Sequence, residues 1–101
     1  MVRLDTITLI RQTPSAHGIF DAVEETRREV YAEVQSVGMS ESYQAMSQGL
    51  APEVRFKLTV SDDYEDEVKA EWRGKLYRVL RTYATRDGGI ELTCGRWHDD
   101  V

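Results

Sequence analysis

The stretch from Glu67 to Trp97 reads EVKAEWRGKLYRVLRTYATRDGGIELTCGRW and decides the fold of this chain. Two turn signals, Arg73-Gly74 and Asp87-Gly88-Gly89, divide it into three runs that contain apolar residues. Short turns of this kind join neighbouring antiparallel strands. The sequence therefore predicts a three-stranded antiparallel meander.

Side chains of the meander are expected to alternate between the two faces of each strand. Both faces of the middle strand, Leu76 to Thr85, carry apolar residues, which predicts that both faces are covered. The alternation sorts the residues as follows: Val68, Ala70 and Trp72 share one face; Tyr77, Val79, Arg81 and Tyr83 lie opposite Leu76, Arg78 and Leu80; and Ile90, Leu92 and Cys94 point inward.

Three further strands precede the meander. Arg27 to Val37 has a period of two, which is typical of a half-buried strand. Leu4 to Gln12 is rich in β-branched residues, and Glu53 to Val60 alternates again. The apolar faces of the three strands consist of Ile7 and Leu9; of Val30, Ala32 and Val34; and of Val54, Phe56, Leu58 and Val60.

Three segments interrupt this β pattern. Thr13 to Glu25 is interpreted as a long surface loop, because it holds a proline and a His-Gly pair. Ser40 to Gly49 predicts a short helix with Ser40 as its N-cap and Gly49 as its C-terminal stop. Ser61 to Glu67 is strongly acidic and predicts a loop that stays in water, because closely spaced like charges repel.

Together these elements predict one small domain spanning residues 1–101. A chain of 101 residues is long enough for one core and too short for two. The strands do not alternate with helices, so a parallel sheet is not expected. The predicted fold is mainly β, a small antiparallel six-stranded β-barrel with one short helix inserted between strands two and three.

Composition narrows the range of functions. The formal net charge of −5 argues against a protein that wraps nucleic acid, because that affinity comes mostly from Lys and Arg. We find no apolar run of the roughly 20 residues that span a bilayer and no signal-peptide pattern, so a cytoplasmic protein without membrane contact is expected. Cys94 is the only cysteine, which fits a reducing compartment and a small buried thiol.

The sequence offers little for catalysis or metal binding. His17 and His98 are far apart in the chain and have no other His or Cys at ligand spacing. The acidic run lacks the glycine and the final glutamate of a calcium loop in register. No nucleophile elbow or phosphate-binding glycine loop is present, and Cys94 is expected to be inert. We therefore expect no enzyme activity, no metal and no cofactor.

Arginines and aromatic residues gather in the meander, which also fits a barrel that binds single-stranded nucleic acid. The set comprises Arg73, Lys75, Arg78, Arg81 and Arg86 with Trp72, Tyr77 and Tyr83. Alternation distributes these residues over both faces of the strands. Because the chain is net negative, a subunit contact or a solvated surface is the favoured interpretation.

Taken in order, five segments of the chain resemble the head-closure, or head-tail joining, proteins of tailed bacteriophages and prophages. These segments are VYAEV from Val30 to Val34, SESYQA from Ser40 to Ala45, PEVRFKL from Pro52 to Leu58, WRGKLYRVLRTY from Trp72 to Tyr83, and IELTC from Ile90 to Cys94. The resemblance lies in their order and spacing rather than in any one motif. The chain departs from the family at the acidic run, where basic or aromatic residues are common.

This resemblance implies a structural protein of the virion neck that assembles in the host cytoplasm. It implies a homo-oligomeric ring of about twelve copies under the portal and its adaptor, with a monomer possible in isolation. The ring closes the head after DNA packaging and offers a docking surface to the tail-completion protein. Packaged DNA passes through without sequence-specific binding, and acidic loops that repel phosphate suit such a channel.

The irregular segments are the candidate surfaces for partner or channel contacts. The candidate residues are Phe20 in the long loop; Ser40, Glu41, Tyr43 and Met46 in the helix; and Asp62, Asp63, Tyr64, Glu65 and Asp66 in the acidic run. Two alternatives stay open: a tail-completion protein of similar fold, and a small barrel that binds single-stranded nucleic acid through Trp72, Tyr77, Arg78 and Arg81.

Overall fold

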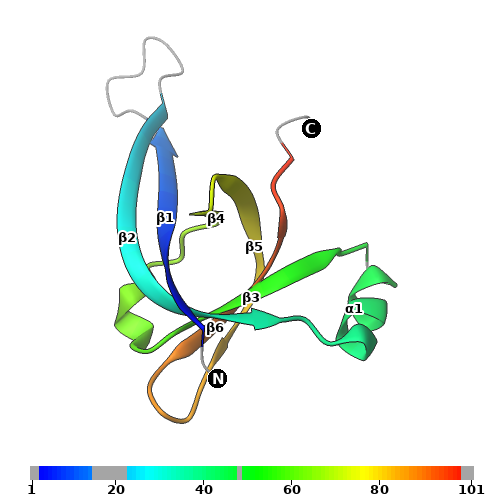
Figure 1. The fold of residues 1–101 in the computed structure, drawn as a ribbon. Coiled ribbons are helices and arrows are strands. Elements are labelled where there is room, and N and C mark those ends of the chain that lie inside the picture. The colour runs from blue at the N-terminus through cyan, green and yellow to red at the C-terminus, as the bar shows by residue number, and fades with distance from the viewer. Residues whose placement is uncertain (1–2, 15–22, 48, 99–101) are drawn as a thin grey trace.

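Six antiparallel strands form one sheet that rings round and closes in the order β1-β2-β3-β6-β5-β4 (Figure 1). The computed structural model describes residues 3–14, 23–47 and 49–98. Its strands are β1 (Leu4–Pro14), β2 (Val23–Ser36), β3 (Pro52–Leu58), β4 (Lys69–Trp72), β5 (Lys75–Ala84) and β6 (Ile90–Arg96). The helix α1 (Met39–Met46) lies between β2 and β3, and the 3-10 turn η1 (Ser61–Asp63) follows β3. The predicted fold class is confirmed.

The core fills the inside of this ring. Phe56 is fully buried and meets the rings of Trp72 and Tyr77 edge-on, with centroid distances of 5.6 and 6.0 Å. Besides Tyr77 of β5, residues from the other five strands surround it: Ile7, Leu9, Val30, Ala32, Val54, Leu58, Ala70, Leu92 and Cys94. Burial raises the pKa of the Cys94 thiol to about 12, as expected for an inert cysteine. The period-two faces thus predicted most of the core.

The turns of the meander have the expected form. Arg73 and Gly74 have φ angles of 52° and 76°, and they join the paired residues Trp72 and Lys75. Two central residues with positive φ match the twist of an antiparallel hairpin. The β5–β6 turn is held by Asp87, which accepts a salt bridge of 2.8 Å from Lys57. This ion pair, with hydrogen bonds from Thr85 and the Gly89 amide, lowers the pKa of Asp87.

Four side chains that were expected to share a face with core residues lie elsewhere. The register between β5 and β6 shifts between Val79 and Arg81, so Arg81 and Tyr83 lie on the face opposite Tyr77. This β-bulge reverses the alternation in the second half of β5. Val60 and Val68 lie outside β3 and β4 and are 49% and 54% exposed, because each strand is shorter than predicted.

The hairpin formed by β1 and β2 is longer than predicted. Their pairing runs without interruption from Leu4 and Glu33 to Pro14 and Val23, whereas β1 pairs with β4 only from Thr8 to Ile10. The part of the hairpin beyond Ile10, residues 11–14 paired with residues 23–26, extends from the barrel as a two-stranded arm (Figure 1). The expected loop from Thr13 to Glu25 is therefore strand at both ends. Phe20 lies outside the described residues.

The helix α1 starts one residue before the predicted N-cap, so Ser40 is a helical residue. The predicted C-terminal stop at Gly49 agrees with the structure, because Gly49 has a φ of 80°, a left-handed conformation that ends a helix. The Leu50 amide donates to the Ala45 carbonyl at 2.9 Å, and the Gly49 amide donates to the Met46 carbonyl at 3.0 Å. This pair of bonds around a left-handed glycine is a Schellman motif. None of the helices in the described ranges is long and apolar enough to cross a membrane.

Candidate partner-binding surfaces

The residues Ser61 to Glu67, here called the acidic segment, are fastened to the β1–β2 hairpin by two arginines. Arg28 on β2 donates from Nη2 to the Asp63 carbonyl at 2.7 Å and to Glu67 Oε2 at 2.7 Å. Arg11 on β1 donates to the Glu65 carbonyl. Both arginines belong to the inner row of the hairpin, on the side of Ile7 and Leu9. The segment is therefore a fixed part of the barrel.

Glu67 is the deepest carboxylate of this segment, with only 3% of its surface exposed. Burial alone would raise the pKa of Glu67, but hydrogen bonds from Arg28 and from the Glu65 amide at 2.7 Å outweigh burial and lower it. An ion pair in this position needs such bonds to offset desolvation. The prediction of an acidic loop that lies wholly in water is wrong at Glu67.

Tyr64 is also a structural residue. Its ring packs against the core, and its hydroxyl donates to the Glu67 carbonyl at 2.7 Å. Burial, with the nearby charges of Asp66 and Glu67, raises the pKa of Tyr64 to about 12. The exposed part of the segment consists of Asp62, Glu65 and Asp66, while Asp63 is half-buried.

Glu41 fixes α1 to the outer face of the sheet. Its carboxylate accepts hydrogen bonds from Arg55 on β3 and from Arg81 on β5. Arg55 also donates from Nε to Thr93 Oγ1 on β6, at 3.2 Å. The pairings of Arg55 with Thr93 and of Thr93 with Arg81 form one cross-strand row under the helix. Glu41 thus attaches α1 to the sheet, and the Arg81 guanidinium is occupied by this contact.

The free surface of α1 is methionine-rich. Met39 and Met46 are 75% and 59% exposed, and their spacing of seven places them on one face of the helix. Ser40 is exposed as well, and the side chain of Tyr43 lies outside the description. Sequence reasoning named Met46 and missed Met39, although the i, i+7 spacing was available as a signal.

The aromatic residues of the meander serve the fold. Tyr77 is 5% exposed and belongs to the core. Trp72 is half-buried and donates from Nε1 to Asp5 Oδ2 at 2.9 Å. The guanidinium groups of Arg3 and Arg73 lie 5.6 and 5.2 Å from the Trp72 ring centroid. The structure therefore does not assemble Trp72, Tyr77 and Arg81 into one exposed stacking surface.

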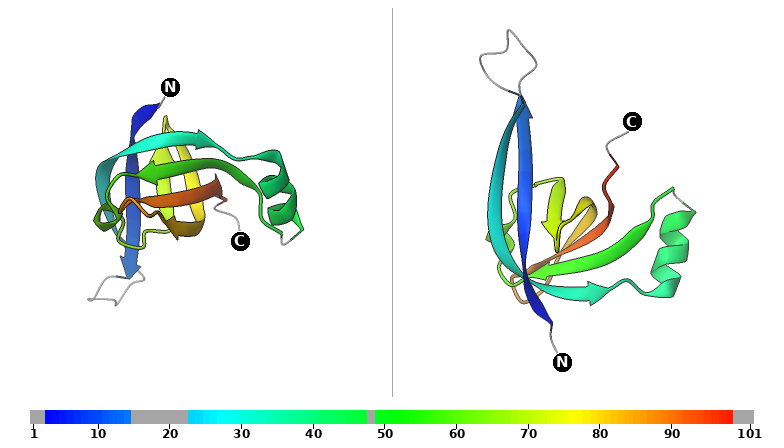
Figure 2. Two further views of the ribbon diagram at one scale, coloured as in Figure 1. Left: turned by 90° about the horizontal axis from the view of Figure 1, so that it is seen from below. Right: turned by 45° about the horizontal axis from the view of Figure 1, so that its top comes forward.

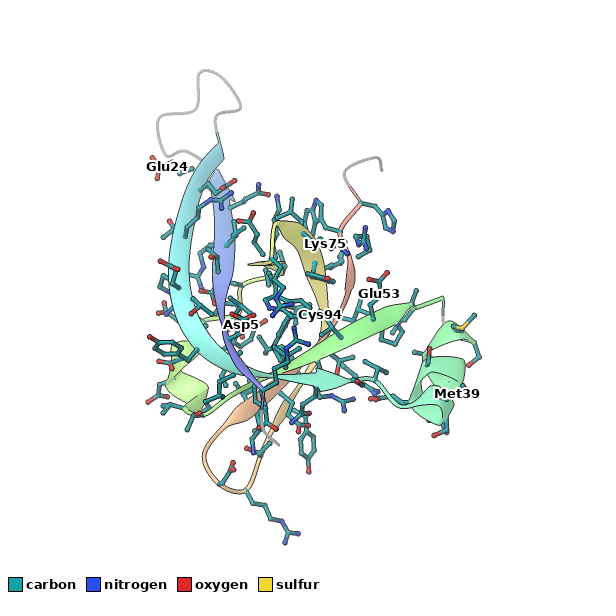
Figure 3. All side chains as sticks on the ribbon, viewed as in Figure 1. Asp5, Glu24, Met39, Glu53, Lys75 and Cys94 are labelled. Carbon is teal, nitrogen blue, oxygen red and sulfur yellow. The ribbon has the colours of Figure 1, made fainter. Side chains whose placement is uncertain are left out.

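A groove of about 570 Å³, here called the basic groove, opens between the α1–β3 connection, the middle of β5 and the end of β6. Its basic groups are Arg78, Arg96 and His98, and Leu50 and Leu80 contribute apolar surface. Glu53 on β3 faces it and lies 3.6 Å from Arg96 (Figure 3). Sequence reasoning did not find this groove, because the bulge at Leu80 and the packing of the α1–β3 connection create it.

Among the described residues, no three His, Cys, Asp or Glu side chains gather in a way that suits a metal ion. Buried side-chain nitrogen and oxygen atoms in the same ranges all have hydrogen-bond partners. No protein-family model matches this chain, and no curated protein matches it in sequence.

Proposed function

We propose that this protein is a structural component of a phage or prophage neck. In this role it forms an oligomeric ring under the portal and adaptor, closes the head after DNA packaging, and provides the docking surface for the tail. The proposal rests on the resemblance of the five sequence segments to head-closure proteins. A protein in this role acts mechanically, through the exposed surfaces that contact its ring neighbours, the portal side and the tail.

One structural observation supports this role most directly: a small closed barrel carries three projecting or exposed elements on different sides. The arm of β1 and β2 and the helix α1 project from the barrel in different directions, and the acidic segment, near η1, lies on a further side of it (Figures 1 and 2). A ring subunit needs separate surfaces for its neighbours, the layer above and the layer below. The exposed Met39 and Met46 suit a protein contact, because methionine adapts to irregular apolar surfaces.

The net negative charge of the chain suits a ring around a DNA channel. Asp62, Glu65 and Asp66 are exposed, and the chain as a whole carries a net charge of −5. Carboxylates repel the DNA backbone, whereas tight binding requires many Lys and Arg contacts. A ring of subunits with this net negative charge holds DNA in place by shape and lets it slide.

Electron microscopy tests the proposal. The protein is mixed with a portal–adaptor complex from the phage or prophage that encodes it, and the particles are imaged after negative staining. We expect an additional ring on the portal. If the protein binds neither the portal complex nor the tail, the proposal is wrong.

Two variants sharpen this experiment. Met39→Lys with Met46→Lys places charge on the exposed face of α1 and should weaken the ring contact if α1 docks on the portal side. The matched control, Tyr31→Lys, places charge on a side chain of β2 that is 77% exposed and lies outside the arm, α1 and the acidic segment. Capture by the tail tube alone would indicate the tail-completion role instead. Binding of an oligonucleotide at low salt would favour the nucleic-acid alternative, which the burial of Tyr77 disfavours.

A further inference from the structure

The basic groove holds two arginines, Arg78 and Arg96, whose charge the fold leaves largely available, with His98 beside them. Among the contacts of the described residues, Arg78 and His98 take part in no ion pair, and both are exposed. Within the described ranges, the one ion-pair partner of Arg96 is Glu53, at 3.6 Å, and both side chains are nearly half exposed. In a chain with a net charge of −5, this groove is a local site of positive charge with apolar surface inside it.

The shape of the groove is set by tight backbone packing. A Cβ atom on Gly95 would lie 2.6 Å from the Ala51 carbonyl oxygen and 3.2 Å from Leu80 Cδ1. Gly95 therefore lets the α1–β3 connection lie directly on β6, and the Schellman motif at Gly49 fixes where that connection begins. The groove is formed before any partner binds, which lowers the entropy cost of binding.

The acidic segment supplies the complementary charge. Asp62 and Asp66 are exposed and form no ion pair among the described residues, and Glu65 is more than half exposed beside Arg28. Arg28 and Arg11 hold the backbone of this segment in place. In Figures 1 and 2 the segment, near η1, and the groove, near the start of β3 and the end of β6, lie on opposite sides of the barrel.

We propose that the basic groove binds the acidic segment of a second copy of this chain. Carboxylates of Asp62 and Asp66 in one copy would pair with Arg78 and Arg96 in the next. Two different surfaces on opposite sides make a head-to-tail contact, and repetition of such a contact builds a ring when the rotation closes. The inference rests on the proposed function and specifies how neighbours in the ring recognise one another.

Charge reversal tests the contact on the isolated, full-length protein. The groove-reversed variant carries Arg78→Glu and Arg96→Glu, and the segment-reversed variant carries Asp62→Lys and Asp66→Lys. Each alone would bring like charges together, whereas an equimolar mixture restores an opposite-charge pair at every contact. Self-association is measured by sedimentation equilibrium and by NMR, in which amide chemical shifts are followed as the protein concentration rises. Concentrations up to about 1 mM are used, so that a contact with a dissociation constant of about that size is detected.

We expect concentration-dependent shifts in the wild type at both the groove and the acidic segment. Each reversed variant should associate at least about tenfold more weakly, and the mixture should recover the wild-type level. A wild type that stays monomeric throughout, variants that associate as the wild type does, or a mixture without recovery would overturn the contact. If a reversed variant does not fold, Arg78→Gln and Asp66→Asn give the same readout with a smaller loss.

The same variants on the portal separate this inference from the proposed function. If the wild type and both reversed variants form equal rings on the portal–adaptor complex, the neck role stands and the contact is wrong. If charge-dependent self-association occurs but no form binds the portal complex or the tail, the contact stands and the neck role is wrong.

Discussion

The acidic segment and α1 are both attached to the barrel by a glutamate that bonds to arginine, but at different depths. Glu67 is 3% exposed, and its neighbour Tyr64 packs on the core. Glu41 is half-buried over the outer face of the sheet, bound to Arg55 and Arg81, while Met39 and Met46 face solvent. The acidic segment therefore closes the core, whereas α1 rests on the outer face of the sheet. The sequence had predicted both as surface elements.

Glu67→Gln should have the largest effect if this comparison is right. Glu67 is the buried member of this pair, and removing its charge leaves the half-buried Arg28 without its main partner, so we expect a loss of about 3 kcal/mol in the free energy of unfolding. Urea denaturation measures it. Glu65→Gln is the matched control, because Glu65 meets the same arginine at 3.7 Å in a far more exposed position. Equal losses for the two variants would contradict the difference in depth.

The same glutamate predicts how stability depends on pH. The folded pKa of Glu67 lies below its ordinary value of 4.5, so its contribution is fully present above that pH and is lost as the pH falls through the folded pKa. The free energy of unfolding, measured by urea denaturation between pH 6 and pH 3, should therefore fall less steeply with decreasing pH in Glu67→Gln than in the wild type. Parallel curves would show that another carboxylate controls the acid transition.

Glu41→Gln should cost less, about 1 kcal/mol, because the Glu41 carboxylate is 23% exposed, against 3% for Glu67, and its partner Arg81 is 57% exposed. The loss should be local: hydrogen exchange of the α1 amides should accelerate while that of β6 stays slow. Glu24→Gln, which alters an exposed carboxylate of the arm, is the control. Global acceleration in Glu41→Gln would mean that α1 is part of the core unit.

Tyr64→Phe removes a single hydrogen bond, from the tyrosine hydroxyl to the Glu67 carbonyl. We expect a loss of about 1 kcal/mol, since the ring continues to fill its place against the core. Tyr83→Phe, at an exposed position of β5, should change stability by less than about 0.5 kcal/mol. Thermal melts of the two variants, measured side by side, compare a structural tyrosine with a surface one.

The smallest effect on stability is expected on the free face of α1. Met39→Ser with Met46→Ser should change the free energy of unfolding by less than about 0.5 kcal/mol, because both side chains are already in water. Portal binding should weaken nevertheless if this face docks on a partner. A large loss of stability would show that the methionines pack on the chain itself.

Local patterns were sufficient where a feature depends on neighbours in the sequence. The period of two in β2 and β3, the Arg73-Gly74 turn and the stop at Gly49 follow from residues close together in the chain. They predicted six strands, the place of the helix and most of the core, because backbone conformation and side-chain alternation are local properties.

Only the tertiary structure decided what each charged residue does. The Arg28–Glu67 pair joins residues 39 positions apart, and the Glu41–Arg81 pair joins residues 40 apart. The bulge at Leu80 depends on the register with β6, and it moves Arg81 to the side of Glu41. Such pairings depend on which strands become neighbours, so the acidic segment was predicted as a solvated loop and the basic groove was not predicted at all.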